Sequence, residues 1–447
     1  MKNISGLYAR ISSSFHSNMN NGTGSTSSFI WHLHPRTLPE STLRFNHTFG
    51  LGGMALLLFV VQIFSGVLLR FVYQASPAEA YHSILLLQNE MLFGQFIRNI
   101  HYWSGSFLVM IVFLHLFRVY FSGAFYSPRQ LNWLLGLLLL FLTVLSNFTG
   151  YLLPWDQRAY WATTISTGML EYIPLLGPWL REWLIGGEEI GGQAMLNFYT
   201  LHTAIFPFLI IFVMSFHFWR VRKAGGVVVP SDLSEKENAF VPAVPNLVVR
   251  ELAVALVLLA VLFMTAALFN APLQAMANPA LSPNPTKAAW YFMGLQELLL
   301  HFHPLLAASA LPLAVSLGLV LLPYLNYPKQ PQGIWFVSDK GRQMAWVAVL
   351  CAVIVTPLYI VANAWLPDVQ NFIAVDPIVA GGVVPAIVLL LSLSGFYYGL
   401  KKRFKATLNE TVQALFVLIT VIFLILTITG IWFRGADMQL VWPWQIP

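Results

Sequence analysis

Long apolar runs alternate with short polar stretches along most of the chain. A helix needs about 20 apolar residues to cross the hydrocarbon core of a bilayer, and nine runs of roughly that length are present. They cover roughly 51–73, 103–122, 131–153, 199–221, 249–270, 305–325, 344–366, 380–400 and 411–433. The pattern predicts an all-α integral membrane protein with about nine transmembrane helices. The odd number places the two termini on opposite sides of the membrane.

Two connections between these runs are long and lie on the same side of the membrane. They cover about 154–198 and 271–304, and loops of this length in a compact protein usually carry function. Before the first run, the stretch ISSSFHSNMNNGTGSTSS is polar and rich in Ser and Asn, which is typical of a mobile arm outside the membrane. We therefore expect residues 1–45 to form a polar N-terminal arm.

The composition agrees with a membrane protein and limits the cofactor chemistry. Of 447 residues, 57% are hydrophobic and 9% are charged, whereas soluble domains carry about 25% charged residues. The single cysteine, Cys351, lies in the apolar stretch VLCAVIV. One cysteine cannot form an intrachain disulfide, a multi-thiolate metal site or a Cys-x-x-Cys-His haem attachment. Any cofactor must therefore be held by other ligands.

The distribution of basic residues predicts the orientation of the chain. One side of the membrane carries Lys2, Arg10, Arg36, Arg44, Arg118, Arg129, Arg220, Arg222, Lys223, Lys329, Lys340, Arg342, Lys401, Lys402, Arg403 and Lys405. The opposite loops are acidic or mixed and carry Glu171, Glu182, Glu188, Glu189, Asp368 and Asp376. The positive-inside rule then places the N-terminus in the cytoplasm and the protein in the inner (plasma) membrane. The net charge of +6 follows from this topology and does not indicate a nucleic-acid partner.

Two of the apolar runs carry a pair of histidines at matching spacing. The stretch HYWSGSFLVMIVFLH places His101 and His115 fourteen residues apart, which is about 21 Å along a helix and on nearly the same helix face. The stretch LHTAIFPFLIIFVMSFH places His202 and His217 fifteen residues apart. Both helices run from outside to inside. His101 and His202 therefore lie at one depth, and His115 and His217 lie at another.

Paired imidazoles at two depths indicate a specific cofactor arrangement. Two histidines that face each other across a helix bundle can be the axial ligands of a six-coordinate haem. Two such levels predict two haems stacked through the membrane. A lone histidine in a membrane helix is equally well explained by packing or by a proton relay, but two matched pairs favour haem ligation.

Glycine spacing on two other helices repeats that of the histidines. Gly52 and Gly66 lie fourteen residues apart in the first run, and Gly136 and Gly150 lie fourteen apart in the third. A porphyrin is a flat plate whose edges need close backbone approach, which glycine permits because it has no side chain. Small residues are also common at helix contacts in membranes. The repeated spacing favours haem clefts.

Two arginines stand near the ends of the second run. Arg98 precedes His101 by three residues, and Arg118 follows His115 by three. Each lies near a membrane face, where a haem propionate would need a cationic partner. The alternative is an arginine that extends from an apolar surface to the interface.

The stretch RNIHYWSGSFLVMIVFLHLFRVYF, followed by GYLLPWDQ and YWA, resembles cytochrome b of the quinol-oxidising cytochrome bc complexes. The GYLLPWDQ motif and the fifteen-residue histidine spacing are closer to the chloroplast-type branch than to the mitochondrial one. The resemblance implies a four-helix dihaem domain at 46–230. It also implies a three-helix domain with the outer quinol loop at 231–366, which resembles the smaller subunit that is separate in the chloroplast type. Residues 367–447 add two helices outside this pattern.

The resemblance implies roles for individual residues. His101 and His202 would bind the outer, low-potential haem, and His115 and His217 the inner, high-potential haem. The outer quinol pocket would be walled by the PWDQ turn and closed by the AAWYF stretch, with Pro154, Trp155, Trp290 and Tyr291 as its residues. Arg222 stands where the chloroplast type has a basic residue near the inner quinone site.

Two departures from the family pattern affect the chemistry. The chloroplast type attaches a further haem through a cysteine just before its LGG, and this chain has Gly50 in that position, in FGLGG. We therefore expect two non-covalent b-type haems and no covalently bound haem. The family's outer loop also carries Pro-Glu-Trp-Tyr, where this chain has Ala288 and Ala289 before Trp290. Alanine cannot accept the proton that this glutamate is thought to take from quinol.

Glu297 is the nearest carboxylate to the altered motif and is a candidate substitute. It lies eight residues after Ala289, and His301 and His303 in LHFHP are further candidates. The alternative for Glu297 is a carboxylate that only hydrogen-bonds at a helix end or between helices. Ionisable groups within membrane segments mark functional sites by default, so we keep the functional interpretation beside the structural one.

The resemblance predicts a dihaem subunit of a quinol:cytochrome c oxidoreductase. Quinol would be oxidised at the outer face, with one electron passing to a Rieske iron–sulfur protein and the other crossing the membrane to reduce quinone on the cytoplasmic side. The chain has no cysteine set for an iron–sulfur cluster or a c-type haem. We therefore expect a Rieske protein, a c-type cytochrome subunit and a homodimer within a larger complex. The two added helices would contact a partner subunit or lipid.

Two other functions are compatible with parts of the pattern. A dihaem cytochrome b anchor would link a dehydrogenase or hydrogenase to the quinone pool without electron bifurcation, and the missing loop glutamate favours this alternative. A Rieske partner in the purified complex would distinguish the two. A cofactor-free transporter would show broken helices and midplane charges and would be colourless. Four histidines in two tiers argue against it.

Overall fold

A computed structural model describes residues 36–231, 239–365 and 375–445 of the chain. In this part of the chain, nine helical spans are long and apolar enough to cross a membrane. They are α4 (Leu51–Arg70), α6 (Gly94–Phe121), α7 (Gln130–Leu152), the span Gly192–Lys223, α12 (Ala243–Leu268), the span Leu305–Tyr324, α15 (Asp339–Trp365), the span Val379–Phe404 and α17 (Leu408–Trp432). The predicted membrane fold of about nine helices is confirmed. Most of the predicted N-terminal arm, and Asp368, lie outside the described residues.

Three of these spans are composite. The span Gly192–Lys223 joins α10 (Gly192–Thr200), the π-helical turn η3 (Leu201–Ile205) and α11 (Phe206–Lys223). The span Leu305–Tyr324 contains η5 (Leu305–Ala310), α14 (Leu311–Leu321) and η6 (Leu322–Tyr324). The span Val379–Phe404 contains η8 (Val379–Val383) and α16 (Val384–Phe404). In each composite span, a proline stands at the start of the α-helical part, where its missing N–H is tolerated.

Several helices extend beyond the apolar runs that predicted them. α6 begins at Gly94 rather than near 103, and α15 begins at Asp339 rather than near 344. In both cases the added turns carry polar side chains such as Gln95 and Arg342. An apolar run marks only the part of a helix inside the hydrocarbon layer, and main-chain hydrogen bonding continues into the interface.

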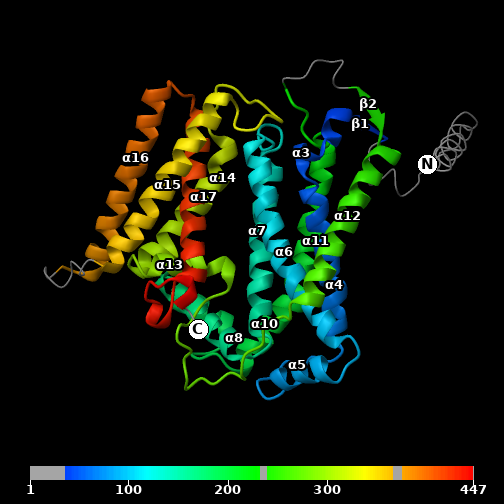
Figure 1. The fold of residues 1–447 in the computed structure, drawn as a ribbon, viewed down its shortest axis with the longest axis vertical. Coiled ribbons are helices and arrows are strands. Elements are labelled where there is room, and N and C mark those ends of the chain that lie inside the picture. Colours follow the sequence, from blue (N-terminus) through cyan, green and yellow to red (C-terminus); the bar gives the residue numbers. More distant parts are fainter. Residues whose placement is uncertain (1–35, 232–238, 366–374, 446–447) are drawn as a thin grey trace, which may run out of the picture.

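The spans form two groups that meet at α7 (Figure 1). In the first group, α4 packs on α6, α7 packs on α11, and α12 covers both α4 and α6. Their shared core is apolar and includes Leu58, Leu108, Leu142, Ile210, Val213 and Leu262. The second group contains α14, α15, α16 and α17, with α16 at its edge (Figure 1).

The last helix, α17, lies inside the molecule rather than at its edge. It packs along α15 and against the short helix α13 (Met293–Leu299), and only to a smaller extent on α16. The Phe416 ring lies 4.1 Å from that of Tyr120 on α6, measured between ring centroids. Asn409 Nδ2 donates to the Tyr126 hydroxyl at 2.8 Å. α17 therefore joins the two groups of helices.

One side of the molecule, at the bottom of Figure 1, carries the structured connections and is called the outer side below. The 154–198 connection forms α8 (Gln157–Gly168), η2 (Met169–Tyr172) and α9 (Gly177–Ile185). The 271–304 connection forms η4 (Trp290–Phe292) and α13. A third structured connection, α5 (Ala80–Asn89), was not predicted because its apolar stretch is too short to cross a membrane. After α17 the chain adds η9 (Ala436–Met438) and η10 (Pro443–Gln445).

The opposite side carries a small two-stranded sheet. Strands β1 (Thr37–Pro39) and β2 (Phe240–Pro242) pair antiparallel, with Thr37 opposite Pro242. The turn η1 (Glu40–Leu43) and the short helix α3 (Phe45–Thr48) follow β1. Runs of three residues are too short to show the alternation that identifies strands in a sequence. This two-stranded sheet holds the start of α4 beside the start of α12.

Candidate functional site

The outer histidine pair has the separation that axial ligation of one metal requires. The ring centroids of His101 and His202 lie 6.0 Å apart, with an interplanar angle of 83°. A metal–imidazole bond of about 2.0–2.1 Å on each side would place two ring centroids roughly 6.3 Å apart. The structure therefore brings together the two residues that the spacing predicted, at a distance that fits a shared metal.

The hydrogen bonds of these two imidazoles leave the same nitrogen on each ring for a metal. His101 Nδ1 lies 2.9 Å from Ser65 Oγ, and His202 Nδ1 lies 2.8 Å from the carbonyl oxygen of Ser146. The Ser65 hydroxyl donates to the Val61 carbonyl at 2.6 Å, so its oxygen accepts from His101. A hydrogen bond at Nδ1 orients the ring and directs Nε2 to a metal.

The inner pair lies one level further along the same two helices. His115 lies fourteen residues after His101 on α6, and His217 lies fifteen residues after His202 in the span Gly192–Lys223. Among the described residues, the buried His115 Nδ1 has no hydrogen-bond partner. The inner histidines therefore lie on the same two helical spans as the outer pair, at the spacing that the sequence gives.

Each of the four predicted glycines faces one of the four histidines. A Cβ atom added at Gly150 would lie 2.5 Å from His202 Cε1, and one at Gly66 would lie 3.1 Å from His101 Cε1. At Gly52 and Gly136 the corresponding distances, to Cε1 of His115 and His217, are 3.5 and 3.7 Å. Glycine is thus needed most at the outer level, where α4 and α7 approach the imidazoles closely.

The four-histidine arrangement suits a metal that already has other ligands. Among residues 36–231, 239–365 and 375–445, no group of three or more His, Cys, Asp or Glu side chains could hold a metal ion by itself. Two facing imidazoles supply only two ligands. A macrocycle such as porphyrin supplies the equatorial ligands itself, so the glycine-lined imidazole pairs fit haem better than a free ion.

The two predicted arginines are buried and make main-chain contacts. Arg98 donates from Nη1 and Nη2 to the carbonyl oxygens of Ala271 and Pro272, both at 2.8 Å. Arg118 donates from Nε to the His47 carbonyl at 2.9 Å, while its Nη2 is buried with no partner among the described residues. Arg98 therefore anchors the start of the second outer loop, and Arg118 keeps a free donor for an anionic group.

Arg222 lies in the last turn of α11, together with Arg220 and Lys223. This placement is the side opposite to the outer loops, as the sequence predicted. The three basic residues also suit the negative end of a helix dipole.

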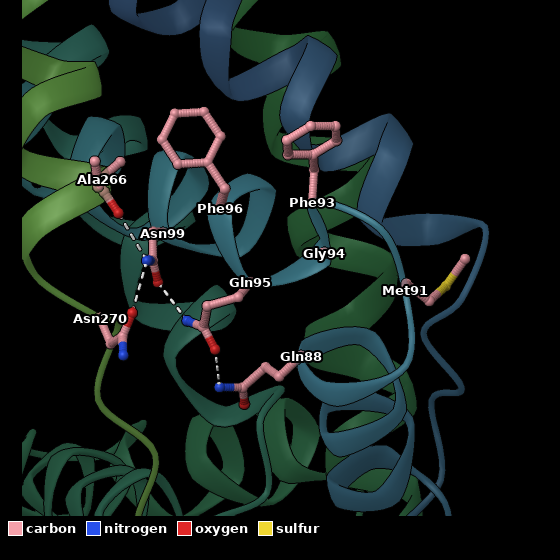
Figure 2. Close-up of a pocket in the computed structure, with 10 residues that line it drawn as sticks. Gln88, Met91, Phe93, Gly94, Gln95, Phe96, Asn99, Ala266 and Asn270 are labelled. Carbon is pink, nitrogen blue, oxygen red and sulfur yellow. Dashed lines mark hydrogen bonds between the residues drawn. The ribbon is translucent and has the colours of Figure 1, made fainter.

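A row of side-chain amides fixes the outer end of α6, where Gln95 and Asn99 lie (Figure 2). The row begins with Gln88 Nε2, which donates to Gln95 Oε1. Gln95 Nε2 then donates to Asn99 Oδ1 at 2.6 Å, and Asn99 Nδ2 donates to the Ala266 carbonyl at 2.8 Å. These residues line a cavity of about 280 Å³ between α5, α6 and the end of α12. The row holds α6 against α12 and so fixes the height of His101.

The PWDQ turn is clamped to the second outer loop. Trp155 is buried and adopts a left-handed backbone with φ +52°. Its carbonyl accepts from the Ala277 N–H at 3.0 Å, and Asp156 Oδ2 accepts from the Gln274 N–H at 2.8 Å. Asp156 Oδ1 also caps α8 by accepting from the Ala159 N–H at 2.8 Å. The structure thus joins Pro154 and Trp155 to the loop that leads to Trp290.

Tyr291 lies near Tyr102 and Tyr151, which are on α6 and α7. Its hydroxyl is buried with no hydrogen-bond partner among the described residues. Burial raises the pKa of Tyr291 far above its ordinary value, and the neighbouring Tyr151 and Tyr102 raise it further. Tyr102 follows His101, and Tyr151 follows Gly150. The Trp290 ring packs edge-on against Tyr291 at 5.6 Å.

An amide, not a carboxylate, lies beside the altered loop motif. Ala288 and Ala289 are both buried. The Ala288 N–H donates to Gln296 Oε1 at 2.7 Å, and Gln296 Nε2 donates to the Thr286 carbonyl at 2.8 Å. Gln296 therefore folds α13 back onto the loop.

Glu297 is fully buried and ion-paired. Arg434 Nε donates to both carboxylate oxygens at 3.1 Å, and Arg434 Nη2 donates to Oε1 as well. His301 Nε2 lies 3.3 Å from Oε1. Burial alone would raise the pKa of Glu297, but hydrogen bonds from His301 and Arg434, together with their charge, lower it overall. The carboxylate is therefore held in its ionised form.

Arg434 was not singled out from the sequence, although a signal existed. It follows the ninth apolar run directly, on the side whose loops are acidic or mixed. A lone arginine there departs from the positive-inside pattern and suggests a specific anionic partner. His303, the other candidate, donates its N–H to the Gly381 carbonyl at 2.7 Å and so ties α13 to η8.

Comparisons with known proteins show which proteins this chain is similar to. The family model Cytochrome b/b6/petB matches residues 38–225. Cytochrome b6 of Prochlorothrix hollandica is 44% identical over 175 residues, which are 39% of this chain and 79% of that protein. Cytochrome b6 of Heliomicrobium gestii is 41% identical over 192 residues, 43% of this chain and 88% of that protein.

The fold of a solved structure extends the likeness to the C-terminal half. A chain from a structure titled "Hyperthermophilic respiratory Complex III" superposes with a TM-score of 0.64 and 24% identity, covering 91% of this chain and 96% of that one. At this identity the likeness shows the fold alone. The matched family model and the extent of the cytochrome b6 relatives that this chain spans show that it belongs to the cytochrome b/b6 family.

Proposed function

We propose that this chain is the dihaem cytochrome b subunit of a quinol:cytochrome c oxidoreductase of the complex III kind. The observation that carries the proposal is the pair of histidine tiers, each faced by glycines from α4 and α7. Family membership supports it, and so does the fold shared with a chain titled as a respiratory Complex III. Residues 46–230 form the dihaem domain, 231–366 the domain with the outer quinol loop, and 367–447 an addition to it.

The four histidines hold two b-type haems in this proposal. His101 and His202 ligate the outer one, and His115 and His217 the inner one, each through Nε2. When bound, the haems accept and donate single electrons. The protein orients the outer imidazoles through Ser65 and the Ser146 carbonyl. Arg118 offers a buried, unpaired Nη2 to an inner propionate, and Arg98 lies at the outer level.

The outer quinol pocket lies between the PWDQ turn and the η4–α13 segment. Pro154, Trp155, Trp290 and Tyr291 wall it, and the clamp between Asp156 and Gln274 keeps the two loops together. Quinol oxidation to quinone releases two electrons and two protons. One electron leaves to a Rieske iron–sulfur partner, the other enters this chain, and the protons leave to the outer side.

Glu297 takes up a proton in this pocket in place of the family's loop glutamate. Its lowered pKa favours the ionised form, which is the form that can accept a proton, and His301 contacts it at 3.3 Å. His301 Nδ1 is buried with no partner among the described residues. Arg222 serves the quinone site on the opposite, cytoplasmic side.

The oligomeric and membrane context follows from the same proposal. The chain works as a homodimer in the inner (plasma) membrane, with its N-terminus in the cytoplasm. A Rieske protein and a c-type cytochrome complete the complex. Gly50 has a left-handed backbone with φ +66° and packs against Val254. Because it is not a cysteine, no haem is attached covalently there.

One observation favours a second candidate function. The proton-accepting position of the loop is occupied by alanine, and Glu297 is engaged in a buried ion pair. A dihaem cytochrome b that links a dehydrogenase or hydrogenase to the quinone pool, without bifurcation, would not need a base in the outer loop. A Rieske protein that copurifies with the chain supports the first function and rejects the second.

A pyridine haemochrome assay with a redox titration of the purified complex tests the haem assignment. We expect two non-covalent b haems per chain with two midpoint potentials. Replacing both outer histidines should remove one component, and replacing both inner histidines should remove the other. One haem or none per chain would reject the two-tier proposal.

A further inference from the structure

The outer end of α17 is tied to the second outer loop at several points. These contacts are the Arg434–Glu297 ion pair, the bond from Lys287 Nζ to the Ile431 carbonyl at 3.0 Å, the bond from Asn284 Nδ2 to Asp437 Oδ1 at 2.7 Å, and the packing of Met293 on Gly430. A Cβ atom added at Gly430 would lie 2.9 Å from Met293 Cε. The contacts cover the segment from 284 to 297, which contains Trp290 and Tyr291.

Arg434 is the central contact of this set. Its guanidinium meets the carboxylate of Glu297 with Nε and Nη2, while Nη1 donates to the Met438 carbonyl at 3.0 Å. Both side chains are buried, with relative exposures of 6% and 0%. A planar guanidinium that bonds both oxygens of a carboxylate fixes its orientation as well as its charge. Lysine cannot reproduce that geometry.

Three segments place basic side chains near the Glu297 carboxylate. Arg434 comes from the chain after α17, His301 from the end of α13, and Lys287 from the loop before η4. On the far side of His301, the Tyr359 ring of α15 lies 5.5 Å from the imidazole. Of these groups, Arg434 makes the most bonds to the carboxylate.

We infer that Arg434 is a positioning residue for the outer quinol pocket: it holds the Glu297 carboxylate in orientation and anchors α13, and thereby the loop, to α17. The inference rests on the proposed role of Glu297 as proton acceptor. Ala288 and Ala289 cannot accept a proton, and Glu297 on α13 is the nearest carboxylate to them in the sequence. A carboxylate buried there needs a fixed cation to remain ionised between turnovers.

Two substitutions in the holo-complex separate the charge of Arg434 from its geometry. Arg434→Gln removes the cation, which raises the pKa of Glu297, so the acidic limb of the pH profile of quinol oxidation should move up by about one unit or more. Arg434→Lys keeps the positive charge but loses the planar guanidinium that contacts both carboxylate oxygens. The acidic limb should therefore stay near that of the wild type, while KM for quinol rises. Arg342→Gln, in an exposed ion pair with Asp339 at 3.4 Å, is the matched control and should change neither quantity.

Infrared spectroscopy gives a readout that does not depend on turnover. At an acidic pH between the acidic limbs of the two proteins, Arg434→Gln should show the C=O stretch of a protonated carboxylic acid that is missing in the wild type. The double variant Arg434→Gln/Glu297→Gln should lack it. An unshifted acidic limb without this band in Arg434→Gln would overturn the inference.

If the complex with Arg434→Gln does not assemble, the Arg434→Lys variant tests the inference. An unchanged KM for quinol in Arg434→Lys rejects the positioning role of Arg434. Glu297→Gln distinguishes failure of the inference from failure of the proposed function. A wild-type rate of quinol oxidation in Glu297→Gln rejects Glu297 as proton acceptor. A loss of rate in Glu297→Gln together with unchanged Arg434 variants rejects only the role of Arg434.

Discussion

Gly150 on α7 lies directly against the imidazole of His202: a Cβ atom at this glycine would stand 2.5 Å from His202 Cε1. Fourteen residues earlier on the same helix, a Cβ atom at Gly136 would stand 3.7 Å from His217 Cε1, which is an ordinary contact distance. One helix therefore excludes a methyl group at the outer level and accepts it at the inner level.

This difference predicts unequal effects of two identical substitutions. Gly150→Ala should displace the His202 ring and lower the haem content from two per chain to about one, because overpacking a tight contact forces side chains out of position. Gly136→Ala should retain both haems. The pyridine haemochrome assay on the two purified variants measures the outcome. Equal haem loss in both variants would contradict the assigned contacts.

The hydrogen bond between Ser65 and His101 should tune the outer haem. Ser65→Ala removes the acceptor for the Nδ1 proton, which makes His101 a less basic ligand. A less basic ligand favours the reduced iron, so the outer midpoint potential should rise by about 30–60 mV, given about 59 mV per tenfold preference in a one-electron couple.

A redox titration of the Ser65→Ala variant measures this shift, and Ser215→Ala provides the control. The Ser215 hydroxyl bonds the Ile211 carbonyl of its own helix at 2.7 Å and touches no histidine ligand in the described structure. The control should leave both potentials unchanged. A shift of the inner rather than the outer potential in Ser65→Ala would reverse the assignment of the two levels.

The Glu297–Arg434 pair should make stability depend on pH. The pKa of Glu297 is lowered in the folded protein, so its stabilisation is fully present above the ordinary carboxyl value of 4.5. It is lost as the pH falls from 4.5 through the lowered pKa, because over this range the unfolded state binds the proton more readily than the folded state. Glu297→Gln should flatten this acidic loss and, at neutral pH, destabilise the protein by about 3 kcal/mol because Arg434 is left unpaired.

Apparent unfolding temperatures measured across acidic and neutral pH in detergent test this expectation. Glu171→Gln is the comparison, because Glu171 pairs with Arg181 at 3.3 Å and its side chain is 49% exposed. An exposed pair contributes about 0–1 kcal/mol. Equal pH profiles for wild type and Glu297→Gln would show that the buried carboxylate does not titrate as described.

The clamp at Asp156 should set the affinity for quinol. Asp156→Ala removes the cap of α8 and the hydrogen bond from the Gln274 N–H. Loss of the cap alone costs roughly 1 kcal/mol of stability. Loss of the second hydrogen bond separates the two outer loops. KM for quinol should rise several-fold, about as expected for a loss of 1–2 kcal/mol in binding, with smaller effects on haem content. Steady-state kinetics of the holo-complex measure it.

Asp376→Ala is the matched control for this clamp. Asp376 Oδ1 accepts from the Ile378 and Val379 N–H groups at the start of η8, away from the PWDQ turn. The Asp376→Ala variant should leave KM for quinol at the wild-type value. The same rise in KM for both variants would point to general destabilisation instead of the clamp.

The sequence by itself determined the membrane spans and predicted the two tiers of histidines. Apolar length is set by bilayer thickness, and helical rise and periodicity are constant. The spacing of His101 to His115 and of Gly136 to Gly150 therefore converts directly into depth and face. The structure brings these residues together as that arithmetic predicts.

The tertiary structure alone decided which segments meet at the outer side. Arg434 reaches Glu297 across 137 residues of sequence, and Asp156 meets Gln274 across 118. Neither contact follows from the spacing within one helix, because it depends on how separate helices pack. The sequence showed that Glu297 is a carboxylate near a membrane face. Only the packing of α17 against α13 decided that this carboxylate is buried, paired and ionised.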